Sequence, residues 1–176
     1  IFENNLEPEV YSFQLLEKII NEAEKQGITD YPIHLKLDTG MHRLGFESEQ
    51  LTEAIEMLRQ NNWVKVASIF SHLSSSDMPE YSDFTLSQIK KFDDWSSKII
   101  SELQINPIRH ILNTSGIYNF SQYQYDMVRL GIGLYGVGND KEENNQLENV
   151  GTLKTIILQI RAVGVGESVG YSRRFV

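Results

Sequence analysis

The sequence predicts an α/β fold with parallel strands, followed by the start of a separate β region. Segments with apolar residues at steps of three and four, typical of helices, alternate with short segments that resemble half-buried strands. Polar residues gather where these strand segments end, and the alternation stops after Tyr135. Alternating helices and strands favour a parallel sheet whose strands are joined by crossover connections.

Three helices are expected from the apolar pattern. The first covers about residues 12–26 and ends at Gly27, a residue that commonly terminates helices. The second follows Ser48, which is a plausible N-cap, and the third runs from about Phe84 to Leu103.

Strands are expected between and after these helices. Each candidate is short, is rich in apolar residues and is bounded by turn or helix signals. The expected strands cover residues 33–38, 63–72, 108–113 and 127–132, and a fifth is possible at 6–12.

The chain divides into three regions by composition. Residues 1–137 form the α/β part, and residues 138–150 are a polar stretch that we interpret as an exposed linker. Residues 151–176 are expected to begin a β domain, because 152–163 is rich in β-branched residues and has no helical period.

Composition excludes several classes of protein. The 16 Lys and Arg residues against 24 Asp and Glu residues give a net charge of −8, which disfavours nucleic acid as a partner. The absence of cysteine excludes a disulfide scaffold and a thiolate metal site. No apolar stretch approaches the roughly 20 residues of a transmembrane helix. The chain starts at Ile1 without a signal-peptide pattern, and we expect the natural start to lie upstream and Val176 to interrupt a domain.

Charged and polar residues mark the carboxyl ends of four successive strand segments. They are Lys36, Asp38 and Arg43, then His72, then Asn113 and Thr114, and finally Arg129 with Gly131. In parallel α/β folds these ends form the rim that faces a ligand. The sequence therefore predicts a site at this rim.

The same residues lie in motifs that resemble a known family. The block His34-Leu-Lys-Leu-Asp-Thr-Gly-Met-His-Arg-Leu-Gly45 is similar to the signature block of alanine racemases. Further matches follow in the same order, namely Phe70-Ser-His-Leu73, His110-Ile-Leu-Asn-Thr-Ser115, Met127-Val-Arg-Leu-Gly-Ile-Gly-Leu-Tyr-Gly136 and Gly166-Glu-Ser-Val-Gly-Tyr171.

The resemblance implies a fold and a function. The fold would be the C-terminal part of a (β/α)8 barrel that binds pyridoxal 5'-phosphate (PLP), followed by the start of a β domain. The parent enzyme would interconvert L- and D-alanine for cell-wall precursor supply in the bacterial cytoplasm. It would act as a homodimer whose second chain completes each active site.

Lys36 and Arg43 have implied roles at the cofactor. A lone strand lysine is usually salt-bridged or extends its amine to solvent, but the matching family lysine is carbamylated, which needs the neutral amine that burial favours. The resulting anion would orient Arg43 toward the phenolic oxygen of the cofactor. His42 departs from the family pattern and has no assigned role.

Arg129 and His72 are implied to act at the other side of the ring. Arg129 could be a simple rim ion-pair partner, but in the family it faces the pyridine nitrogen and leaves it unprotonated, since a guanidinium only donates hydrogen bonds. His72, which alone would be interpreted as structural, would lie between Arg129 and Tyr171. Tyr171 would be a catalytic base, and its ordinary pKa of about 10 requires polarising neighbours.

Phosphate binding is expected at the strand-end hydroxyl and nearby amides. Thr114, with the main chain of Gly131 and Ile132, provides such donors, and Asn113 belongs to the same cofactor-binding set. The alternative interpretation is a turn cap and a tight barrel closure.

Important family elements are missing from the sequence. No block like Val-Lys-Ala-Asn-Ala-Tyr-Gly, which carries the lysine that binds the cofactor and serves as the second base, is present. We therefore expect the segment alone to be inactive. The alternatives are another barrel-type PLP racemase or a decarboxylase relative, and a non-catalytic cofactor-binding scaffold. A metal hydrolase using His34, Asp38, His72 and His110 is a weaker alternative, and no metal site is expected.

Overall fold

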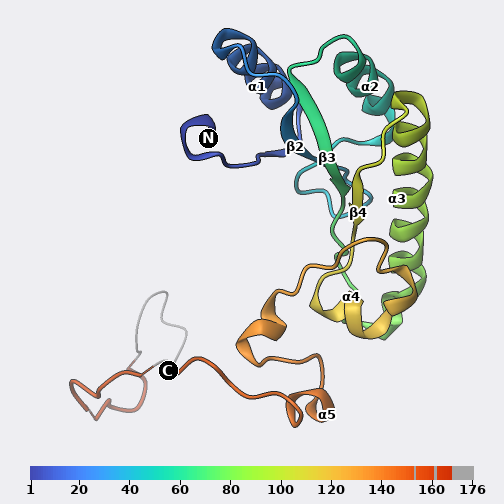
Figure 1. Ribbon diagram of the computed structural model, residues 1–176. Coiled ribbons are helices and arrows are strands. Elements are labelled where there is room, and N and C mark those ends of the chain that lie inside the picture. The colour runs from blue at the N-terminus through green and yellow to red at the C-terminus, as the bar shows by residue number, and fades with distance from the viewer. Residues whose placement is uncertain (153, 161, 168–176) are drawn as a thin grey trace.

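The computed structural model describes residues 1–152, 154–160 and 162–167 and contains one parallel sheet (Figure 1). Each strand pairs in parallel with the next strand along the chain, which is the connectivity of a barrel segment. The strands, in sheet order, are β1 (Glu9–Val10), β2 (Tyr31–Lys36), β3 (Val64–Phe70) and β4 (Ile108–His110). The predicted α/β class is therefore confirmed.

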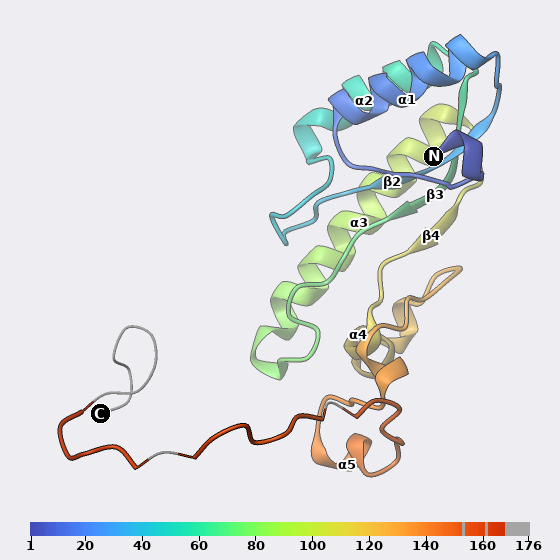
Figure 2. The same ribbon diagram turned by 90° about the vertical axis from the view of Figure 1, so that its left-hand side faces the viewer.

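Three long helices cover one face of this sheet, and its other face lies on the concave side of the chain (Figures 1 and 2). They are α1 (Phe13–Gln26), α2 (Leu51–Arg59) and α3 (Ser82–Leu103). Between helices and sheet lies the apolar core, in which Leu16, Ile33, Ile69 and Phe92 are fully buried. None of the helices in the described part of the chain combines the length and apolarity of a membrane span.

Local signals set the ends of the first two helices. Ser12 caps α1 by accepting a hydrogen bond from the Leu15 amide at 3.4 Å, and Gly27 ends it with a φ of 66°. The N-cap expected at Ser48 is wrong. Glu47 caps a short 3₁₀ turn that leads into α2, where its side chain forms a capping box with Gln50.

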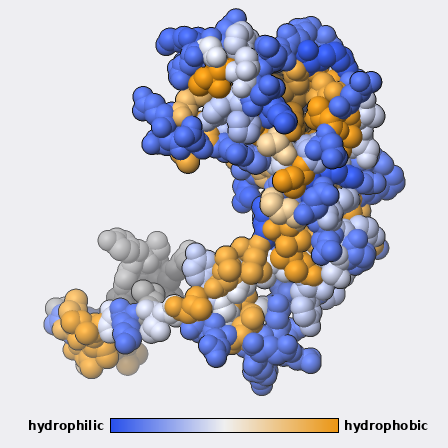
Figure 3. Space-filling model, in the orientation of Figure 1, coloured by the Kyte–Doolittle hydropathy of each residue, from blue (hydrophilic) through white to orange (hydrophobic). Residues whose placement is uncertain are grey.

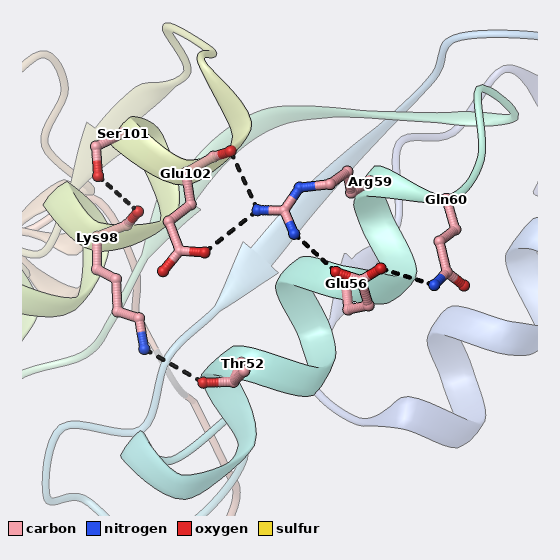
Figure 4. Close-up of polar contacts among 7 residues, drawn as sticks. All are labelled: Thr52, Glu56, Arg59, Gln60, Lys98, Ser101 and Glu102. Atoms are coloured by element: carbon pink, nitrogen blue, oxygen red, sulfur yellow. Dashed lines mark hydrogen bonds and ion pairs between the residues drawn. The ribbon is translucent and has the colours of Figure 1, made fainter.

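Polar side chains tie α2 to α3 on the outer surface (Figure 4). Arg59 donates to Glu56 Oε2 at 2.7 Å and to Glu102 Oε2 at 3.2 Å, and so links both helices. Lys98 adds a hydrogen bond to Thr52 at 3.3 Å. These pairs are exposed, so each contributes only about 0–1 kcal/mol.

The strand predicted at residues 127–132 does not form. From this stretch, Arg129 donates one backbone hydrogen bond to Leu112 O at 3.0 Å, and a single bond does not make a ladder. A 3₁₀ turn covers Ile132–Tyr135 instead. Two short helices were not predicted. They are α4 (Thr114–Asn119) and α5 (Lys141–Asn144), and α5 lies inside the expected linker.

The tail beyond the α/β part extends away from it (Figures 1 and 3). The described residues of 151–167 form no helix or strand, so the strand expected within 152–163 is absent from them. Ile156 and Leu158 are 77% and 88% exposed. A strand requires a neighbouring strand to satisfy its backbone groups, and no described residue of the tail belongs to the sheet. The division into domains stays a prediction.

Candidate active site

Most of the predicted cofactor-binding residues meet around one hollow of about 290 Å³ at the carboxyl ends of β3 and β4. The hollow is open and lies beside the 3₁₀ turn that follows Arg129. Its lining residues are His72, Asn113, Thr114, Ser115, Arg129, Leu130, Gly131 and Ile132. Arg43 is the one predicted cofactor-binding residue that does not line it.

Arg129 is held by carbonyl groups and one histidine. Its Nη2 donates to Ser71 O at 2.6 Å and Ile111 O at 3.3 Å, and its Nη1 donates to His110 Nδ1. The guanidinium also lies 5.1 Å from the centre of the Phe70 ring. Burial lowers the pKa of Arg129 to about 10, so the side chain is still a cation at neutral pH.

His72 lies at the edge of this guanidinium, with its Nδ1 3.5 Å from Arg129 Nη2. Burial, followed by the positive charges of Arg129 and Arg43, lowers the pKa of His72 to about 4. The imidazole is therefore neutral at pH 7. It presents an acceptor to Arg129 and, in that tautomer, a donor on its other nitrogen.

Lys36 forms an ion pair with Glu9, with its Nζ 2.7 Å from Glu9 Oε1. The amine also lies 5.4 Å from the centre of the Phe70 ring. Lys36, Arg43 and His72 border a second, much smaller hollow. Within the described residues the Arg43 side chain forms no hydrogen bond or ion pair, so Lys36 and Arg43 are neighbours without direct contact. Carbamylation of Lys36 stays a prediction.

The loop that carries Arg43 is organised by Asp38. Its Oδ1 accepts hydrogen bonds from the amides of Gly40, Met41 and His42, and its Oδ2 accepts one from Arg43, each at 3.0 Å. Burial raises the pKa of Asp38, but these backbone hydrogen bonds outweigh it and hold the pKa below its ordinary value. Sequence reasoning placed Asp38 at the rim and missed this role, although an aspartate before a Thr-Gly turn is a signal for such bonds.

Thr114 lies against the glycine-rich turn. Its Oγ1 accepts hydrogen bonds from the amides of Gly131 at 2.9 Å and Gly133 at 3.3 Å. A Cβ atom at position 133 would lie 2.9 Å from Thr114 Cγ2, so only glycine allows this approach. Thr114 and Gly131, which are both predicted to bind phosphate, are therefore in contact.

Asn113 has a structural role that the sequence did not reveal. Its Oδ1 accepts from Gly116 N at 2.9 Å, which caps α4, and from Ser76 Oγ at 2.7 Å. Its Nδ2 donates to Leu73 O at 3.2 Å. These contacts engage both ends of the amide, so a contact between Asn113 and a ligand would come from its main chain.

The four residues of the metal alternative do not converge. His34 pairs with Glu7, Asp38 is engaged by amides, and His110 pairs with Arg129. Nowhere in the described ranges do three His, Asp or Glu side chains meet in a way that could hold a metal ion. Tyr171, the predicted catalytic base, lies outside the described residues.

A larger hollow, of about 720 Å³, lies at the opposite end of the sheet. It is bordered by Arg59 and Glu102, whose ion pair links α2 and α3 (Figure 4), and by the amino end of β3. It contains none of the predicted site residues. The volume of a hollow therefore does not identify the candidate site. The smaller hollow lies at the carboxyl ends of the strands, where parallel α/β barrels bind their ligands, and most of the predicted cofactor-binding residues line it.

Comparisons with known proteins agree on one family. The family model described as "Alanine racemase, N-terminal domain" matches residues 1–139. An alanine racemase of Fusobacterium nucleatum is 43% identical over 146 residues, covering 81% of this chain and 39% of that protein. Alanine racemase 1 of Clostridium acetobutylicum is 34% identical over 181 residues, covering 99% of this chain and 46% of that protein.

Solved structures give the same result. An alanine racemase of Clostridium difficile matches with a TM-score of 0.74 and 26% identity, covering 98% of this chain and 46% of that one. The alanine racemase of Bartonella henselae with covalently bound pyridoxal phosphate matches with a TM-score of 0.66 and 25% identity, covering 78% and 38%. The chain thus spans less than half the length of these relatives. With the family model matched over most of its residues and the motif residues His72, Thr114 and Arg129 gathered at one rim, the chain belongs to the alanine racemase family.

Proposed function

We propose that the complete protein carrying this sequence interconverts L- and D-alanine with PLP as its cofactor. The observation that carries the proposal is the hollow in which Arg129, His72, Thr114 and the glycine-rich turn meet. When bound, PLP delocalises the electrons left behind when an amino acid loses its α proton. The remaining chemistry is positioning and proton transfer by protein groups.

The residues around the hollow fit such a cofactor. The Thr114 hydroxyl accepts two backbone hydrogen bonds and keeps its own hydrogen for a phosphate oxygen. The close approach of Gly133 to Thr114 depends on the absence of a Cβ, which would lie 2.9 Å from Thr114 Cγ2. We propose that Thr114, Gly131 and Ile132 hold the phosphate, with Asn113 shaping the loop through its cap.

Arg129 is suited to contact the pyridine nitrogen of the cofactor without protonating it. The guanidinium only donates hydrogen bonds, and it stays charged at neutral pH despite its burial. A pyridine nitrogen held by Arg129 would accept a hydrogen bond and remain unprotonated. This weakens electron withdrawal and favours return of the proton over competing reactions.

His72 and Tyr171 form the proposed acid–base side of the site. His72 is neutral at pH 7 because its pKa is about 4, and its Nδ1 faces Arg129. The proton on its other nitrogen would then be available to a tyrosine oxygen, which lowers the pKa of the phenol. We propose Tyr171 as this tyrosine and as a catalytic base.

Lys36 and Arg43 are proposed to act at the phenolic oxygen of the cofactor. Arg43 has a side chain free of protein partners within the described residues, as a ligand contact requires. The Lys36 amine pairs with Glu9 at 2.7 Å, so carbamylation would require that amine to lose its proton and exchange Glu9 for Arg43.

The biological setting is also a proposal. Alanine would be the substrate, and two chains would share each active site as a homodimer. D-Alanine for peptidoglycan places the activity in the bacterial cytoplasm.

The test uses the complete protein with PLP. We expect an absorbance band of lysine-bound cofactor and exchange of the alanine α proton with solvent deuterium from both enantiomers. Arg129→Gln should reduce this exchange, and Thr114→Ser should retain cofactor binding because the hydroxyl is kept. Cofactor binding without exchange would support a scaffold, and faster exchange with other amino acids or release of CO2 would support a broader racemase or a decarboxylase.

A further inference from the structure

A row of polar side chains crosses the inner face of the sheet and ends at Arg129. His34 Nε2 lies 2.9 Å from Glu7 Oε2, and His34 Nδ1 lies 2.7 Å from Ser68 Oγ. Ser68 Oγ lies 3.1 Å from His110 Nε2, and His110 Nδ1 is the acceptor for Arg129 Nη1. An uninterrupted chain of hydrogen bonds therefore joins the Glu7 carboxylate to the Arg129 guanidinium.

The two ends of this chain fix the direction of every bond in it. Arg129 can only donate, so His110 Nδ1 must be unprotonated. Burial, then the charge of Arg129, lowers the pKa of His110 to about 4, so this ring is neutral at pH 7 and carries its proton on Nε2. That proton is donated to Ser68 Oγ.

The second half of the chain follows from the first. Since the Ser68 oxygen accepts from His110, its own hydrogen is donated to His34 Nδ1. His34 then carries a proton on Nε2 and donates it to Glu7, a carboxylate that only accepts. All four bonds point from Arg129 toward Glu7, which is the arrangement in which neighbouring hydrogen bonds strengthen one another.

Burial makes the middle of the chain sensitive to substitution. Ser68 is 1% exposed and His110 is 4% exposed, whereas the Glu7 side chain is 49% exposed and reaches solvent. Without the Ser68 hydroxyl, the His110 Nε2–H would lose its acceptor in a buried place. The ring could then turn toward another acceptor, which would take Nδ1 away from the Arg129 N–H donor.

We propose that Ser68 and His34 are positioning residues for Arg129, which act through His110 by holding its ring with Nδ1 toward the guanidinium. The chain of hydrogen bonds stands on the described contacts alone. Only the catalytic consequence, a correctly oriented Arg129, rests on the proposed function.

The test is nitrogen NMR of the complete protein with ¹⁵N-labelled histidine and no added PLP, which keeps it independent of the racemase proposal. The His110 signals are assigned with His110→Gln. We expect wild-type His110 to show an unprotonated Nδ1 that accepts a hydrogen bond, Ser68→Ala to shift that resonance toward the position of an unprotonated nitrogen without a donor, and Ser68→Thr to restore it. Ser96→Ala, a buried serine on α3 bonded to Asp93 O, is the matched control.

His34 provides a second pair of variants if Ser68→Ala does not fold. His34→Gln keeps an acceptor for Ser68 and a donor for Glu7, whereas His34→Leu removes both, so only the latter should shift the His110 resonance. With PLP and alanine, the disruptive variants should lower kcat more than they raise KM. A wild-type His110 protonated on Nδ1, or an Nδ1 resonance unchanged in both Ser68→Ala and His34→Leu, would overturn the proposal.

Discussion

Replacing Asp38 by asparagine should loosen the loop that carries Arg43. The carboxylate accepts four amide hydrogen bonds at 3.0 Å. Hydrogen bonds to charged groups contribute about 1.5–3 kcal/mol each against about 0.5–1.5 for neutral ones, so each of the three bonds to Oδ1 weakens by about 1 kcal/mol. The Arg43 amide would face the new NH2 group and lose its acceptor. Because three donors share one oxygen and the loop can be hydrated, we expect a total loss of about 2–3 kcal/mol.

Urea unfolding of the complete protein measures this loss, with Asp77→Asn as the control because Asp77 is exposed and forms no bond within the described part of the chain. The control should change stability by less than about 0.5 kcal/mol. The pKa of Asp38 is lowered in the folded state, so its contribution is present above the unfolded-state pKa and is lost as the pH falls through the folded-state value. If Asp38→Asn matches its control at pH 7, the carboxylate does not organise the loop.

Two further predictions follow from buried groups. The pKa values of His72 and His110 are about 4 against an ordinary 6.5; the unfolded chain therefore binds protons first, and the free energy of unfolding should fall as the pH drops from 6.5 toward 4. A pH series of urea midpoints checks this, and a flat dependence would contradict the burial of both rings. In Gly45→Ala the new Cβ would lie 2.5 Å from Asp38 N at a φ of 136°, so soluble yield or thermal stability should fall sharply. Gly27→Ala, with open space around it, should cost only about 1–2 kcal/mol, and equal effects of the two would refute the steric argument.

Periodicity was sufficient for the elements that pack through a regular face. The expected helix at 12–26 is observed as Phe13–Gln26, and the one at 84–103 as Ser82–Leu103. The strand expected at 33–38 is observed as Tyr31–Lys36. Its pattern continues past Lys36, but the backbone turns there because Asp38 N donates to Phe46 O at 2.9 Å instead of to a neighbouring strand.

Elements that depend on a neighbour could not be predicted in this way. Residues 127–132 resemble a strand, yet strand formation requires a full ladder, and one bond to Leu112 O does not provide it. The short helix α4 had a local signal, since Asn113 is a favoured N-cap residue. The motif favoured a cofactor-binding role for this residue, and the alternative of a turn cap is the one its side chain fulfils.

In the candidate site, too, the sequence predicted some residues but not the side chains that hydrogen-bond to them. The sequence predicted that Arg129 and His72 share the rim, but it gave no role to Ser68 and considered His34 only as a metal ligand. The reason is a register shift in the pairing of β2 with β3, where Ile33 pairs with Val66 but His34 pairs with Ser68. This leaves Ala67 as an extra residue, a bulge of a kind that redirects side chains near active sites.

In a regular register, with Ala67 paired to His34, Ser68 would pair with Leu35, whose side chain lies in the apolar core, 1% exposed. Successive side chains of a strand point to opposite faces, so the serine would enter the layer beneath the helices and leave His34 and His110 without their shared partner. Alanine is small and apolar enough for either face, so the sequence pattern does not reveal the bulge. The link between Glu7 and Arg129 thus depends on a backbone irregularity rather than on a motif, which is why only the folded chain makes it visible.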